Sequence, residues 1–275
     1  MTAGKNVITE PVSVRILIGG LSILFLAVII GLPVVVVFVE ALRNGIAAYW
    51  EGINEEYALA AIRLTLLVAA IAVPMNILFG LTASWAITKF EFTGKRLLIT
   101  FIDLPFSVSP VISGLIYIML FGVNSALGRW LDDHGVRIIF AVPGLVIATI
   151  FVTLPFVARE LIPLMEEQGS EEEEAALLLG ASGWRTFYRV TLPKIKWGLL
   201  YGVLLCNARA MGEFGAVSIV SGHIKGSTNT IPLHVEALYN EYNFVAAFAV
   251  ASILTLLALL TLLLKRMVEN RARAE

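Results

Sequence analysis

The chain has 275 residues, of which 58% are hydrophobic and only 15% are charged, and its formal net charge is −1. A soluble domain is nearer half apolar and a quarter charged, so the composition excludes an ordinary globular protein. The near-neutral charge and the scattered basic residues argue against a nucleic-acid-binding surface. The single cysteine, Cys206, excludes an internal disulfide and is expected to be a small packing residue in an apolar run.

The first apolar segment follows Lys5 and Arg15. It is too long for the core of a cleaved signal peptide and lacks an A-x-A-like site, so it is expected to be an uncleaved first span. A helix needs ~20 apolar residues to cross the hydrocarbon, since lipid offers no partner for backbone polar groups. By this measure the chain has six spans, roughly at 16–42, 58–88, 97–121, 139–164, 197–221 and 244–264.

Five prolines fall inside these spans, which membrane helices tolerate when neighbouring groups satisfy the freed backbone groups. Neither an internal repeat nor a separate soluble domain is recognisable. The sequence therefore predicts an all-α, polytopic bundle of about six transmembrane helices, with one domain covering 16–264. The prolines are Pro33, Pro74, Pro105, Pro110 and Pro155.

Lysine and arginine are distributed unevenly between the two sides of the membrane. Fourteen lie at the termini and in the second and fourth loops, four lie in the other loops, and Arg63 and Arg209 lie within spans. Arg159 is counted with the fourth loop. Since cytoplasmic loops carry the excess of basic residues, both termini and the long loop at 166–196 are predicted to be cytoplasmic.

This loop is the largest part of the chain that is predicted to lie outside the bilayer. Its acidic run at 171–174 suits the positive end of a helix dipole, and Ser170 with Glu173 fits a capping box. From the acidic run alone, a solvated loop with a helical hairpin is the simplest interpretation.

The second half of the loop contains further helix signals. Gly180 is expected to end the acidic helix and to permit a close backbone approach at the joint. A second short helix at 184–190 is expected to end before Pro193. Two such helices would form a compact docking element, rigid enough to carry a displacement into the spans.

The spacing within the loop resembles the E-A-A-x3-G-x9-I-x-L-P loop of ABC importer permeases, with valine in place of isoleucine at 190. In that family the loop forms a coupling helix that sits in a groove of the ATP-binding subunit, and the resemblance implies this role here. No G-x-x-x-x-G-K-[ST] sequence occurs, so ATP hydrolysis is expected in a partner subunit. The matching residues are Glu174, Ala175, Ala176, Gly180, Val190, Leu192 and Pro193.

Arg209 and Glu213 lie four residues apart in the fifth predicted span, hence on one helical face. Because burying either one alone in lipid costs a few kcal/mol, they are expected to pair and to face a polar interior. The pair either fixes helix packing or lines the pathway, where Arg209 would meet an anion transiently. The sequence favours neither interpretation.

The segment at 207–216 resembles the A-R-x-x-G-E-F-G-A segment of sulfate and molybdate permeases. The stretch at 103–114 is similar to the L-P-x4-P-x3-G stretch of the third span in this group, with Ser109 where fully apolar versions have a second proline. Its small residues would allow close helix approach near a translocation path. The pathway or gate candidates are therefore Asp103, Pro110, Gly114, Arg209 and Glu213.

The tail at 218–243 resembles the W-type permease of sulfate/thiosulfate importers, and the likeness as a whole covers nearly the entire chain. It implies a type I importer permease fold in the cytoplasmic (inner) membrane. It also implies assembly with a T-type sister permease, two ATP-binding subunits and an extracytoplasmic sulfate/thiosulfate-binding protein, and it implies no cofactor. Molybdate, tungstate or another oxyanion is the alternative substrate.

An ion-coupled secondary carrier and a membrane enzyme are the competing classes of protein. A carrier needs several interior carboxylates or histidines as relays, whereas only Asp103 and Glu213 are candidates. An enzyme would cluster its polar residues at one depth, and the three histidines are scattered. His223 and His234 are interpreted as loop histidines, and no metal site is expected because no third ligand is near them.

Overall fold

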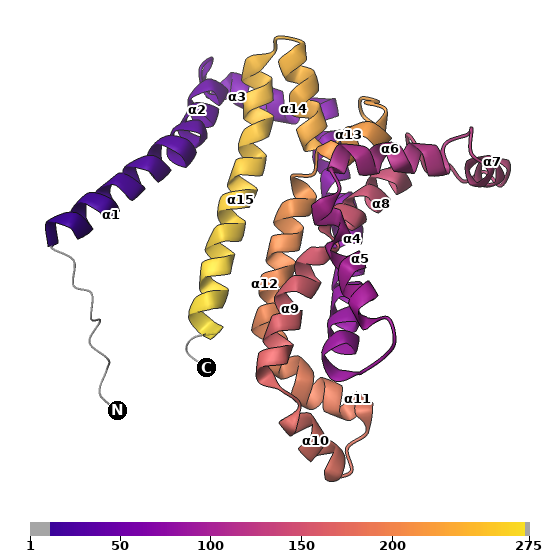
Figure 1. Cartoon of the computed structure of the whole chain (residues 1–275). Helices are drawn as coiled ribbons and strands as arrows, with labels where there is room; N and C mark the ends of the chain where they lie inside the picture. Colours follow the sequence, from indigo (N-terminus) through magenta and orange to yellow (C-terminus); the bar gives the residue numbers. More distant parts are fainter. Residues whose placement is uncertain (1–11, 273–275) are drawn as a thin grey trace.

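The computed structural model describes residues 12–272, which form helices and contain no strand. Two bent helix pairs and four long apolar helices give up to six membrane spans if each bent pair is one span. All six coincide with predicted spans, so the all-α bundle of about six spans is confirmed (Figure 1). The long helices are Ser13–Ala41, Glu56–Lys89, Val142–Gln168 and Phe244–Glu269.

The first span consists of α1 (Val12–Leu26), a π-helical turn η1 (Ala27–Gly31) and α2 (Leu32–Ala41). Pro33 lies in the first turn of α2, and the wider turn before it accommodates the missing N–H and the bulk of the ring. α2 packs along α15 (Phe244–Ala272), whereas α1 diverges from the rest of the bundle (Figure 1).

The centre of the bundle is formed by α4 (Glu56–Lys89), which packs on α8 (Val142–Thr153), α9 (Pro155–Gln168) and α12 (Leu192–Met211). In lipid, such contacts depend on close van der Waals packing, which small residues permit. A Cβ added to Gly80 of α4 would lie only 2.7 Å from the Val157 Cβ of α9. The glycine therefore sets the distance between these two helices.

The third span is not one straight helix. α5 (Lys95–Ser107) and α6 (Pro110–Phe121) meet at an angle of 108°. The residue before a proline avoids the helical region, and Ser109 accordingly has φ −57° and ψ 133°. The expected continuous segment at 97–121 is thus a broken span or a re-entrant loop.

The fifth span is also bent, by 46°, between the helical segment Gly183–Met211, whose last part is α12, and α13 (Gly215–Ser221). α13 packs closely on α6. A Cβ on Gly114 of α6 would lie 2.8 Å from the Ile219 Cβ and 2.9 Å from the Ala216 carbonyl oxygen. Gly114 therefore allows the two bent segments to lie against each other.

Different short helices lie at the two ends of the bundle. α3 (Gly45–Asn54), α7 (Ala126–Asp133) and α14 (Ile231–Asn240) lie toward one end, and the helices of the long loop lie toward the other (Figure 1). The end of α15 lies toward the loop end (Figure 1). The cytoplasmic placement of the termini stays a prediction from the charge count. Lys5 and Arg273 lie outside the described residues. Arg159, which the count placed in the loop, is instead part of α9, because that helix extends to Gln168.

The interpretation of His234 as a loop histidine is wrong, since it lies in α14 and its exposed fraction is 1%. Neither ring nitrogen has a hydrogen-bond partner among the described residues. Burial lowers the pKa of His234 below its ordinary 6.5, while Glu55 and Glu241 oppose this shift and Lys225 adds to it.

We predict that His234 makes the subunit less stable in acid. Because its pKa is lower in the folded state, the unfolded chain binds the proton first, and stability falls as the pH drops through 6.5. The slope from this one group is at most about 1.4 kcal/mol per pH unit. Melting temperatures in detergent between neutral and mildly acidic pH should show a shallower dependence in His234→Gln. An unchanged pH dependence of the melting temperature in His234→Gln would show that His234 does not destabilise the subunit in acid.

Candidate functional site

The long loop forms a compact projection, here called the coupling knob and defined as residues 170–191. It contains α10 (Glu171–Leu178), α11 (Gly183–Thr186) and a π-helical turn η2 (Phe187–Thr191). Leu178 and Leu179 are each 89% exposed at the end of α10. Trp184 and Tyr188 stack on each other and are also exposed. The knob projects from the bundle (Figure 1), and its large apolar side chains are exposed there.

Ion pairs fix the knob to the spans. The Lys89 Nζ at the end of α4 lies 3.1 Å from the Glu173 carboxylate, and both side chains are largely buried. The Thr191 hydroxyl donates to the same carboxylate at 3.2 Å, and Lys89 also donates to the Gly169 carbonyl. A second pair joins Lys194 of α12 to Glu172 at 3.0 Å. These contacts hold the knob in a defined position on α4 and α12.

The predicted capping box is wrong. Ser170 makes no side-chain cap, and its hydroxyl donates to Glu174 instead. Glu173 cannot reach back because Lys89 and Thr191 hold its carboxylate. The acidic residues at 171–174 do occupy the first turn of α10, as the dipole argument predicts.

Two further expectations for the knob are corrected. The helix at 184–190 does not stop before Pro193. The wider π-helical turn η2 accommodates the proline, which has no backbone N–H, and the chain continues directly into α12. Gly180 has φ +85°, which favours glycine, but no atom outside its neighbourhood lies within 4 Å of its would-be Cβ. Its role is thus to form the turn after α10, and no close backbone approach occurs there.

The structure distributes the seven loop residues over three elements. Glu174, Ala175 and Ala176 lie in α10, and Gly180 lies in the turn. Val190 lies in η2, while Leu192 and Pro193 begin α12. Sequence reasoning missed Leu178 and Leu179 as surface residues and Lys89 as the anchor. The only sequence signal for the leucines is an apolar pair directly before a glycine in an otherwise acidic segment.

Arg209 and Glu213 form an ion pair with 2.6 Å between Nη1 and Oε2, as predicted. They do not share a helical face, because α12 ends at Met211 and Glu213 lies in the bend before α13. The Glu213 side chain is 1% exposed and its other oxygen accepts from the Ala216 N–H at 2.9 Å. The Arg209 side chain is 35% exposed. Glu213 thus secures both Arg209 and the start of α13.

Of the five pathway candidates, the structure brings Pro110 and Arg209 to one cavity of about 260 Å³ at the break of the third span. Glu213 pairs with Arg209 but is not among the residues that line the cavity. Asp103 is not in the lining of this cavity and pairs with Arg159 at 2.8 Å. Gly114 packs against α13, as described above.

We predict that Gly114→Ala weakens the packing of α6 on α13. The added methyl would collide with Ile219 and with the Ala216 carbonyl, so one helix must shift. Overpacking of this kind costs about 1–3 kcal/mol. The melting temperature of the purified subunit should fall in Gly114→Ala. Gly31→Ala is the matched control because a Cβ at Gly31 meets nothing within 4 Å. Equal melting temperatures for the two variants would contradict the packing role.

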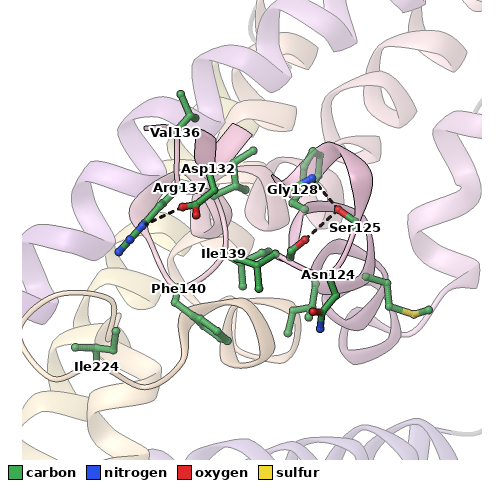
Figure 2. A pocket seen from close by; sticks show the side chains of 15 residues that line it. Asn124, Ser125, Gly128, Asp132, Val136, Arg137, Ile139, Phe140 and Ile224 are labelled. Carbon is green, nitrogen blue, oxygen red and sulfur yellow. Dashed lines mark hydrogen bonds and ion pairs between the residues drawn. The ribbon is translucent and has the colours of Figure 1, made fainter. Parts of the chain in front are cut away.

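A larger cavity of about 700 Å³ lies beside α7, at the end of the bundle opposite the knob (Figure 2). Its walls are mostly apolar, and Asp132 and Arg137 form an ion pair of 3.4 Å at its rim. Ser125 accepts from the Gly128 N–H and so caps α7 beside it. Residues 12–272 contain no group of three His, Cys, Asp or Glu side chains that could hold a metal. None of the pathway candidates lies in this cavity.

A family model described as "Binding-protein-dependent transport system inner membrane component" matches residues 76–274. The chain belongs to this family. The matched part of this permease includes the coupling knob and both broken spans.

Relatives agree with this assignment, and a solved structure shares the fold. The sulfate transport system permease protein CysW of Escherichia coli (strain K12) is 52% identical over 252 residues, 92% of this permease and 87% of that protein. The sulfate transport system permease protein CysT of the same strain is 37% identical over 243 residues, 88% of each chain. A bacterial alginate ABC transporter in complex with an alginate pentasaccharide-bound periplasmic protein has a similar fold, with TM-score 0.77 and 15% identity over 94% of this permease and 95% of that chain.

Proposed function

We propose that this permease is a transmembrane subunit of an ATP-binding-cassette importer that moves sulfate or thiosulfate across the cytoplasmic (inner) membrane. The coupling knob is the observation that carries the proposal. It presents two leucines that are 89% exposed, and ion pairs hold it on α4 and α12. A projecting apolar surface of this kind is typical of a protein-protein interaction site. The names of the relatives, which are sulfate permeases, supply the anion.

The geometry suggests how ATP hydrolysis elsewhere would act on the pathway. The knob continues through η2 into α12, whose 20 residues extend about 30 Å. Arg209 lies near the far end of this helix. A displacement of the knob by an ATPase would therefore move the end of α12 against α6 and α13, as alternating access requires. The loop residues from Glu174 to Pro193 would mediate this coupling.

The proposal implies a heteromeric assembly. The T-type sister permease would complete the pathway, since the CysT relative is a second permease of the same family at lower identity. Two ATP-binding subunits would bind at the coupling knobs, and a sulfate/thiosulfate-binding protein would deliver the anion from the opposite side. Residues 16–264 would form one permease domain with both termini in the cytoplasm, as the distribution of basic residues favours. All catalysis would belong to the ATPases.

The anion can be tested by competition. The assembled importer is placed in proteoliposomes with its ATPase subunits facing the lumen, ATP in the lumen, and the binding protein outside. These vesicles should take up radiolabelled sulfate. Excess thiosulfate should compete, whereas molybdate and tungstate should compete weakly. Uptake of labelled molybdate in preference to sulfate would replace the proposed substrate by the alternative oxyanion.

A further inference from the structure

The breaks in the third and fifth spans meet at one place. The third span is interrupted at Val108 and Ser109, and the fifth is interrupted between Met211 and Gly215. A Cβ on Gly215 would lie 3.0 Å from the Pro110 Cβ, so the two interruptions are in direct contact. Non-helical backbone at membrane depth is tolerated where it is buried in protein or lines a water-filled cavity. Here it borders the cavity of about 260 Å³.

The lining of this cavity is suited to an anion. Arg209 is the charged residue in it, and Ser107 and Ser109 contribute exposed hydroxyl groups. The ion pair with Glu213 involves Nη1, and a guanidinium has five N–H donors, so further donors remain. α6 begins at Pro110 beside the cavity, and its first hydrogen bond to the preceding turn comes from Ser113. The positive end of the α6 dipole therefore adds to the charge of Arg209.

We infer that this cavity is a low-affinity site for a tetrahedral oxyanion, held by Arg209 with the two serine hydroxyls and the start of α6. The inference rests on the proposed function and names where the transported anion would contact this subunit. Arg209 would stay ion-paired with the buried Glu213 through Nη1 and would form charge-assisted hydrogen bonds to the anion with its other N–H groups. Because a water occupies about 30 Å³, the cavity holds such an anion together with several waters.

The competition from Glu213 explains why the site would be weak. Glu213 is almost fully buried and lies 2.6 Å from Arg209, so it neutralises the cation before an anion arrives. A site for a dianion on a transport pathway must release it, and a permanently satisfied arginine avoids trapping. The pair thus supplies a positive group that is present in the cavity but only partly available.

Thiol labelling in the assembled importer tests the site. Cys206 is buried, and its replacement by alanine gives a subunit without cysteine, so that labelling is followed on the isolated band of this subunit. Ser109→Cys in this background should react with an anionic methanethiosulfonate reagent, and millimolar sulfate should slow the reaction relative to chloride at equal ionic strength. Thr93→Cys, exposed in the turn between α4 and α5 and outside the coupling knob, is the matched control and should show no protection by sulfate.

The role of Arg209 is tested in the same assay. The double variant Arg209→Gln, Glu213→Gln keeps a neutral hydrogen-bonding pair and should raise the sulfate concentration for half-protection by about tenfold or more. Arg209→Lys, which keeps the charge, should retain protection. A Ser109→Cys thiol that does not react, that sulfate fails to protect, or that is protected equally in the double variant overturns the inference. If the unmodified importer takes up sulfate in any of these cases, the proposed function stands and only this site is refuted.

Discussion

Replacing Leu178 and Leu179 together by glutamate is expected to abolish ATP-driven uptake and to leave the permease folded in the membrane. Both side chains are 89% exposed at the tip of the coupling knob, so the substitutions remove no contact from the core of the bundle. If an ATPase covers them, each leucine contributes about 1.5–3 kcal/mol by burial. Loss of both weakens binding about 100-fold or more, and two buried carboxylates would weaken it further.

The measurement is co-purification of the ATPase with the permease, together with uptake in the same membranes. Leu178→Met, Leu179→Met keeps the apolar surface and serves as the matched control. Glu171→Gln, also exposed on α10, controls for a change of charge on the knob. Normal uptake by the double glutamate variant would remove the knob from the coupling mechanism.

Replacing Gly80 by leucine is expected to have the largest effect on folding. Even a Cβ at this position would lie 2.7 Å from Val157 Cβ and 3.2 Å from the Ala158 backbone nitrogen of α9. The neighbouring backbone cannot move locally, because α9 also packs on α12. Overpacking by one methyl costs about 1–3 kcal/mol, and leucine adds three more carbons at the same contact.

The expected result is a lower yield of monodisperse permease and a clearly reduced melting temperature in detergent. Gly20→Leu in α1 is the control, since a Cβ at Gly20 meets nothing within 4 Å. Gly80→Ala should fall between the control and Gly80→Leu. Should Gly80→Leu melt at the same temperature as Gly20→Leu, the α4–α9 contact would not limit the stability of the bundle.

Features that depend only on local sequence patterns, such as apolar length, charge and residue spacing, were predictable. Apolar length located the four long helices and the two bent pairs that make up to six spans. The Arg209–Glu213 pair followed from the cost of leaving either charge alone in lipid. The knob was recognisable because its spacing resembles a known loop.

Features that depend on contacts between distant segments were not predictable. The 108° bend needs Pro110, but a proline alone is compatible with a kinked span, and the contact of Gly114 with α13 makes the sharp bend possible. The capping box failed because Lys89, on another helix, holds Glu173. The cavity beside Arg209 arises from the meeting of two breaks, and local patterns contain no information about it.

Dependence on the energy source tests the central claim most directly. The assembled importer should take up radiolabelled sulfate only when ATP is present, and an uncoupler that dissipates the proton gradient should leave the initial rate unchanged. Uptake that continues without ATP and stops when the gradient is dissipated would contradict the account, because the permease would then be an ion-coupled carrier.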